Sequence, residues 1–106
     1  MLKSLDRGIG KILDALENLG ISDNTLIIFS SDNGGADYIH LSNINKPYRG
    51  WKLTHFEGGM HIPFMAKWPN KIKAGSIYDY PIHQNDILPT VAEAAGAQIP
   101  NDRIID

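Results

Sequence analysis

The chain has 106 residues and a mass of 11.7 kDa, which is enough for one small domain. Its 10 Lys and Arg against 12 Asp and Glu give a formal charge of −2, which favours neither nucleic acid nor an anionic membrane as a partner. The absence of cysteine excludes disulfides, thiolate zinc sites and a cysteine nucleophile. No apolar run approaches the ~20 residues of a membrane-spanning helix, and the first residues lack the apolar core of a signal peptide.

An amphipathic helix is predicted near the N-terminus. Its apolar residues recur at helical spacing: Leu5, Ile9, Ile12, Leu13, Leu16 and Leu19. Ser4 is the candidate N-cap, and Gly20 stands where a helix end favours a left-handed residue. Gly8 and Gly10 each weaken the helix by about 1 kcal/mol relative to alanine, so we expect packing to hold it in place.

Two strands are predicted, separated by a long loop. Residues 25–29 form a continuous apolar run, which favours a strand covered on both faces, as in a parallel sheet flanked by helices. Residues 62–68 form the second, with Pro63 near its start. The polar, glycine-rich segment from residue 30 to residue 59 far exceeds the usual connection of about 4–6 residues, and such loops are generally functional or disordered.

A second helix is predicted over residues 86–95, after an exposed turn at residues 71–75. Pro89 suits its first turn, and Gly96 ends it. The order helix, strand, loop, strand, helix indicates the α/β class, with few, mostly parallel strands and flanking helices. Because these elements are too few to cover both faces of such a sheet, we expect residues 1–106 to be a single fragment of a larger domain.

The strongest local feature is Asp32-Asn33, directly after the first predicted strand. Ligands of open α/β sheets bind beyond the carboxyl ends of strands, and these two side chains offer oxygen ligands suited to Ca²⁺ or Mg²⁺. Gly34 and Gly35 let the backbone turn away sharply. The alternative is an Asx-type turn without a metal, since Asp-Asn-Gly-Gly is also good turn chemistry.

A second feature is the basic stretch at residues 46–52. Lys46, Arg49 and Lys52 are suited to a multiply charged anion, although the number of cations by itself favours a solvated basic loop. A zinc site is not supported, because no pair of the four histidines has helical i, i+4 spacing: His40, His55, His61 and His83.

Taken together, these stretches resemble the sulfatase family of the alkaline-phosphatase-like superfamily. The resemblance covers nearly the whole chain and rests on residues 5–11, 23–34, 47–52, 56–64, 68–69 and 86–90. It implies a partial sulfatase fold with a long active-site loop. It also implies that Asp32 and Asn33 bind a divalent cation, usually calcium, and that Lys52 contacts the sulfate. Arg49 and Glu57 match motif positions and are expected to fix the loop; His61 stands where the family often has arginine.

The family nucleophile, a formylglycine made from Cys or Ser in a Cys/Ser-x-Pro-x-Arg motif, has no counterpart here. The acidic pair that completes the metal site is also missing. We therefore expect this chain to lack the N-terminal half and the C-terminal subdomain of the catalytic domain. The parent protein is expected to hydrolyse a sulfate ester, and the isolated chain to be inactive. All of this assumes that Asp32 and Asn33 face the same hollow as the Lys52 ammonium.

Two alternatives stay open. A phosphonate monoester or phosphodiester hydrolase of the same superfamily uses the same metal scaffold. A non-catalytic remnant or assembly module is the other; its uncovered sheet faces are expected to drive oligomer formation. Relatives are commonly exported, periplasmic or lysosomal, but these residues carry no address, and they do not identify the sulfate ester.

Overall fold

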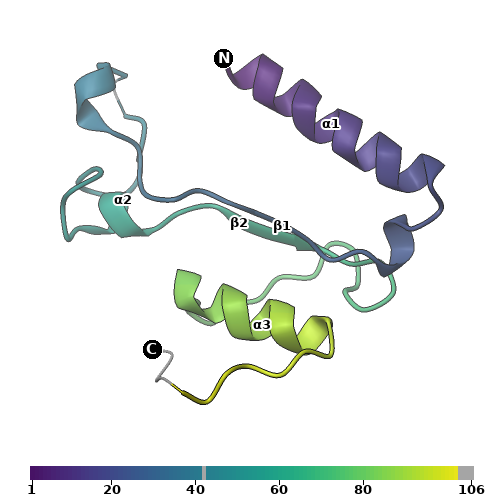
Figure 1. Cartoon of the computed structure of the whole chain (residues 1–106). Coiled ribbons are helices and arrows are strands. Elements are labelled where there is room, and N and C mark those ends of the chain that lie inside the picture. The colour runs from purple at the N-terminus through teal and green to yellow at the C-terminus, as the bar shows by residue number, and fades with distance from the viewer. Residues whose placement is uncertain (42, 103–106) are drawn as a thin grey trace. The chain divides into compact units, whose positions relative to one another are not determined.

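The structure is a computed structural model that describes residues 1–41 and 43–102, and it divides into two units, Met1–Ala74 and Gly75–Asp106. Figure 1 shows the elements along the chain: helices α1 (Leu2–Asn18), α2 (Glu57–Met60) and α3 (Ile87–Ala94), strands β1 (Ile27–Ser30) and β2 (Phe64–Lys67), and single 3-10 turns at Ser22–Asn24, Asp37–Ile39 and Gln84–Asp86. Within the described residues, no helix has the length and apolar character needed to cross a membrane.

The predicted N-terminal helix is confirmed as α1, with a different start. The helix begins at Leu2, so Ser4 as N-cap is wrong: Ser4 lies in the first turn, and its N–H donates to the Met1 carbonyl at 2.9 Å. The end is as predicted, since Gly20 has φ +68° and its N–H donates to the Glu17 carbonyl at 2.9 Å. The Ile21 N–H bonds the Leu16 carbonyl at 3.1 Å, which completes a Schellman motif.

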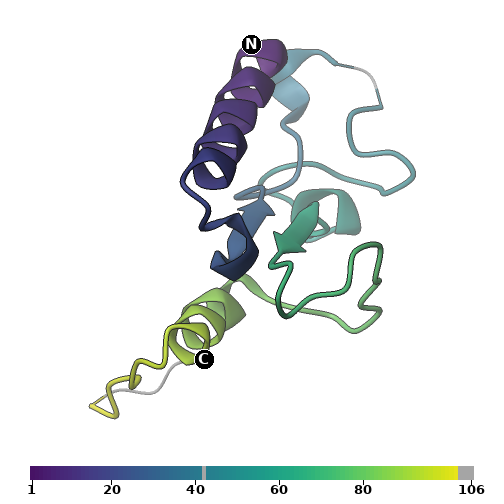
Figure 2. The ribbon, with the colours of Figure 1, turned by 90° about the vertical axis from the view of Figure 1, so that its right-hand side faces the viewer.

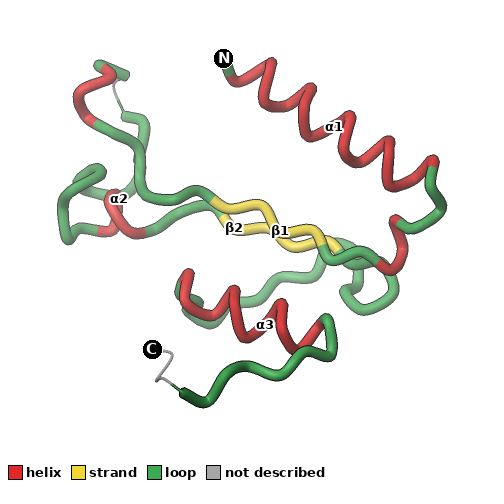
Figure 3. The backbone as a smooth tube through the Cα atoms, in the orientation of Figure 1, coloured by secondary structure: helices red, strands yellow, loops and turns green. Residues whose placement is uncertain are grey.

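The two predicted strands are confirmed, but the expectation of parallel strands is wrong. β1 and β2 pair antiparallel, with Ile27 opposite Lys67 and Ser30 opposite Phe64. Figure 2 shows the two strand arrows pointing in opposite directions. A parallel pair needs a crossover that travels back along the sheet, usually as a helix. Here the helices that the structure describes in the connection are short, a 3-10 turn at Asp37–Ile39 and the four-residue α2, and the chain returns to the same end of the strands (Figure 3).

The strands are only partly covered within this chain. β1 is mostly half-buried, whereas every residue of β2 is exposed. Among the described residues no hydrophobic side chain is buried, and Phe29 and Met65, which pair across the strands, are 37% and 57% exposed. The covering on both faces that the apolar run of β1 predicts is therefore not supplied by the described residues.

In the second unit, the predicted helix is confirmed as α3. Pro89 lies in its first turn, and the Asp86 carboxylate accepts a 2.6 Å hydrogen bond from the His83 N–H just before the helix. Gly96 has φ +65°, and the N–H groups of Gly96 and Ala97 bond the carbonyls of Glu93 and Ala92 at 3.0 and 2.8 Å. These two hydrogen bonds form a second Schellman motif, which explains why the helix ends at Gly96 as predicted.

Candidate functional site

The predicted metal ligands lie in the loop that follows β1. Asp32 is exposed and Asn33 is half-buried. The Ser31 hydroxyl donates to the Asn33 carbonyl at 2.9 Å, and Asn33 Nδ2 donates to the Gly34 carbonyl at 2.8 Å. The Asn33 amide nitrogen is thus used locally, while Oδ1, the atom able to ligate a cation, takes no part in that bond.

Backbone contact joins this loop to α2. The Gly34 N–H donates to the Gly59 carbonyl at 3.0 Å. A Cβ atom on Gly34 would lie only 1.9 Å from the Gly58 carbonyl oxygen, so this approach is open to glycine alone. The pair Asp32 and Asn33 is therefore held against the segment that carries the Glu57-Gly58-Gly59 motif.

Lys52 lies in a tight turn beside the same loop. Its N–H donates to the Gly35 carbonyl at 3.1 Å, and its side chain is half-buried. The turn is closed by a 2.9 Å bond from the Thr54 N–H to the Trp51 carbonyl, and Leu53 takes the unusual φ of +80°. The Thr54 hydroxyl both accepts from the Trp51 N–H at 3.0 Å and donates to the Trp51 carbonyl at 2.7 Å.

Glycines also pack the Lys52 turn onto α2. The Gly58 N–H donates to the Arg49 carbonyl at 2.8 Å, and a Cβ on Gly58 would lie 2.3 Å from the Gly50 carbonyl oxygen. A Cβ on Gly59 would lie 2.3 Å from the Thr54 carbonyl oxygen. The backbones of the Asp32 loop, the Lys52 turn and α2 thus form one interlocked group. That the side chains of Asp32, Asn33 and Lys52 face one hollow stays a prediction.

Asn45 is a residue of this group that the sequence did not reveal. Its Oδ1 accepts from the Gly35 N–H at 2.7 Å, and its Nδ2 donates to the carbonyls of Gly35 and Gly50, each at 3.0 Å. Asn45 neither follows a strand, as Asn33 does, nor differs locally from Asn43 in the same loop, so no sequence signal pointed to it.

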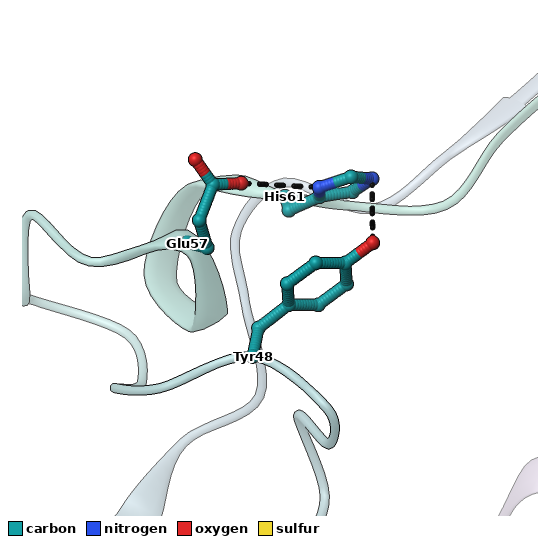
Figure 4. A network of polar contacts seen from close by, with 3 residues as sticks. All are labelled: Tyr48, Glu57 and His61. Atoms are coloured by element: carbon teal, nitrogen blue, oxygen red, sulfur yellow. Dashed lines mark hydrogen bonds and ion pairs between the residues drawn. The ribbon is translucent and has the colours of Figure 1, made fainter.

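Figure 4 shows a second network, built by Tyr48, Glu57 and His61. The Tyr48 and His61 rings stack with centroids 4.2 Å apart, and Tyr48 Oη lies 3.4 Å from His61 Nε2. His61 Nδ1 lies 3.1 Å from the Glu57 carboxylate. Nearby in sequence, the Arg49 guanidinium stands 4.1 Å above the Phe56 ring. Arg49 and Glu57 thus each make contacts within the loop itself.

The donor set after β1 fits a hard cation only as part of a site. Asp32 and Asn33 supply a carboxylate and an amide oxygen, which are calcium-type ligands, but Ca²⁺ takes about 6–8 oxygens. Within residues 1–41 and 43–102, no three His, Asp or Glu side chains come together as a metal-binding group. Further ligands would have to come from outside this loop.

Comparison with known proteins gives a consistent result. The chain is 36% identical to mouse steryl-sulfatase, 40% identical to human steryl-sulfatase and 43% identical to mouse N-acetylgalactosamine-6-sulfatase, in each case over 99% of its length. It spans only 18–21% of the length of these relatives.

The fold matches as well. The whole chain superimposes on the crystal structure of Ps i-CgsB in complex with k-i-k-neocarrahexaose, with a TM-score of 0.91 and 37% identity, and covers 23% of that chain. The model of the sulfatase family matches residues 1–97. With nearly its whole length matched in sequence and in fold, the chain belongs to the sulfatase family.

Proposed function

We propose that this chain forms part of the catalytic domain of a sulfatase, in which Asp32 and Asn33 bind calcium and Lys52 binds the sulfate group of a sulfate ester. The observation that carries the proposal is the hydrogen bond from the Lys52 N–H to the Gly35 carbonyl, which fixes the lysine backbone beside the Asp32 loop. A cation site and an ammonium group held side by side suit a multiply charged anion.

The chemistry assigned to these residues is binding and orientation. The Lys52 ammonium offers charged donors to the sulfate oxygens, on which negative charge is concentrated. Asp32 and Asn33 would hold the cation, which supplies Lewis-acid stabilisation of the same oxygens when bound. The chain has no cysteine, and no serine stands in the formylglycine pattern, so the proposal takes the nucleophile from the remainder of the domain.

A chimera tests the proposal directly. Residues 1–106 replace the matched segment of mouse N-acetylgalactosamine-6-sulfatase, and hydrolysis of a chromogenic sulfate ester is measured. We expect turnover in the chimera, and a loss of about 10²–10³-fold in kcat/KM on Lys52→Ala, since one charged donor to the reacting group disappears. Lys11→Ala on the exposed side of α1 is the matched control and should leave the rate unchanged.

Two results would contradict the proposal. One is a Lys52→Ala chimera as active as its parent; the other is an Asp32→Ala chimera whose calcium dependence is unaltered. The ratio of rates for sulfate and phosphate esters in the same chimera separates the sulfatase from a phosphoesterase of the same superfamily.

The isolated chain gives a complementary prediction. With the nucleophile and further metal ligands supplied elsewhere, the purified 106-residue protein should show no turnover of an aryl sulfate and only weak calcium binding. Calorimetry and a sensitive colorimetric assay check both points. Submicromolar calcium affinity would refute the partial-site interpretation of Asp32 and Asn33.

A further inference from the structure

We propose that Asn45 is a positioning residue that couples the Asp32 loop to the Lys52 turn. The inference rests on the proposed function for the roles of Asp32, Asn33 and Lys52. The coupling itself rests on the three hydrogen bonds of the Asn45 side chain, which together touch both segments.

The Asn45 side-chain amide uses both its polar ends on one residue, Gly35. Its Oδ1 takes the Gly35 N–H and its Nδ2 gives to the Gly35 carbonyl, as a neighbouring backbone strand would do. A Cβ on Gly35 would lie 2.8 Å from Asn45 Oδ1, so the side chain sits tightly against this glycine. Asn45 therefore fixes the two peptide groups that flank the Gly35 Cα, one through its N–H and the other through its carbonyl.

The Gly35 carbonyl that Asn45 bonds also accepts a hydrogen bond from the Lys52 N–H. The Gly35 carbonyl accepts from Asn45 Nδ2 at 3.0 Å and from the Lys52 N–H at 3.1 Å. Asn45 Nδ2 also donates to the carbonyl of Gly50, two residues before Lys52. The Asn45 amide thus makes two hydrogen bonds to Gly35 in the Asp32 loop, one as acceptor and one as donor. It makes a third, as donor, to Gly50 beside the Lys52 turn.

An alternative explanation is that Asn45 merely satisfies polar groups in its own loop. In that case its removal would disturb its direct partners only. If Asn45 positions the two segments, its removal must also release the Lys52 N–H, which Asn45 does not touch, because the acceptor of that N–H loses its fixed orientation. The Lys52 amide is therefore the decisive probe.

Amide hydrogen exchange of the ¹⁵N-labelled full chain provides the first test. In Asn45→Ala, exchange at Gly35 and at Lys52 should both rise by at least about tenfold, since hydrogen bonds are lost at or beside each. The amides of the β1–β2 pair should keep their rates. Asn18→Ala, at the exposed end of α1, is the control and should change neither loop amide.

Asn45→Asp keeps the test decisive if Asn45→Ala unfolds the chain. A carboxylate still accepts from the Gly35 N–H but donates nothing to the Gly35 and Gly50 carbonyls. We expect the Gly35 amide to stay protected while Lys52 exchanges at least about tenfold faster. Wild-type protection of Lys52 in this variant, or in a folded Asn45→Ala, overturns the proposal.

A calcium titration followed by NMR adds a signature that a merely structural role would not give. In the wild type, millimolar Ca²⁺ should shift the Asp32 and Asn33 amides and, through Gly35, the Lys52 amide. In Asn45→Asp the Asp32 and Asn33 shifts should persist and the Lys52 shift should be lost. An equal Lys52 shift in both proteins overturns the coupling. No shift at Asp32 or Asn33 refutes the calcium proposal instead, and the exchange result then decides Asn45 alone.

Discussion

Gly34 shows how closely single atoms control this loop. A Cβ at this position would lie 1.9 Å from the Gly58 carbonyl oxygen. This is a backbone atom, so no side-chain rotation can relieve the clash. Gly34→Ala should therefore destabilise the chain by about 1–3 kcal/mol, the usual cost of forcing an extra carbon into a packed site. Urea unfolding followed by tryptophan fluorescence measures the change.

Gly8→Ala is the matched control for that substitution. Gly8 lies inside α1, where a Cβ would meet nothing within 4 Å. Alanine there should stabilise the helix by about 0.5–1 kcal/mol, because glycine loses more backbone freedom on folding. Equal effects of the two alanines would show that the contact at Gly34 is not the cause.

Leu53 carries backbone strain next to Lys52. Its φ of +80° belongs to a region that glycine adopts easily and leucine does not, and its side chain is 86% exposed, so little packing compensates. Leu53→Gly and Leu53→Ala remove the same contacts, yet only glycine relieves the strain. We expect the glycine variant to be more stable than the alanine variant by about 1 kcal/mol, measured by urea unfolding.

At the residue scale, the sequence points to candidate residues whose chemistry and position mark them, and their role as a site stays a prediction. Asp32 and Asn33 stand out because oxygen ligands follow a strand, and Gly34-Gly35 because they allow a sharp turn. Asn45 could not be predicted, because its three hydrogen bonds reach residues five and ten positions away. Partners at such separations produce no local sequence pattern. The positive φ of Leu53 could not be predicted either, because leucine rarely adopts a positive φ.

Among the elements, the 3-10 turn Gln84–Asp86, which leads directly into α3, has a capping box that the sequence did not indicate. The Asp86 carboxylate accepts from the His83 N–H at 2.6 Å, and the Asn85 N–H bonds His83 Nδ1 at 3.2 Å. Asp86→Ala should destabilise this turn, and with it the start of α3, by about 1 kcal/mol, the usual value of a capping group. NMR secondary shifts over Ile87–Ala94 measure the loss of helix.

The control for the cap is Asp86→Asn, which keeps an acceptor oxygen and should retain most of the helix. If Asp86→Ala leaves the secondary shifts unchanged, the carboxylate does not contribute to the cap.

The elements themselves were predictable where local pattern decides them. Both glycine-terminated helices end as predicted, because the left-handed residue and its two hydrogen bonds are local. The strand direction was not predictable in this way. The apolar run of residues 25–29 reports burial on both faces, and burial does not tell which way the neighbouring strand runs.

For the molecule as a whole, the main feature is how much apolar surface stays exposed to solvent. The chain exposes 9230 Å². Among the described residues no hydrophobic side chain is buried, so each of the two units leaves apolar surface uncovered.

This predicts a shallow denaturation curve for the isolated chain. The slope of unfolding free energy against urea scales with the area exposed on unfolding, so it should be lower than that of a compact domain of similar length. A compact domain of similar length, measured in parallel, is the control. An equal slope would mean that the chain alone buries its surface fully, as a self-associated species could, and sedimentation velocity distinguishes that case.

The direct return of the chain from β1 to β2 affects what a recombination between related genes would transfer. The hydrogen bonds described above that tie the Asp32 loop to the Lys52 turn lie between residues 27 and 67, within one continuous stretch of the polypeptide. A recombination event that exchanges this stretch between related genes would therefore transfer both proposed roles together, cation binding by Asp32 and Asn33 and sulfate binding by Lys52.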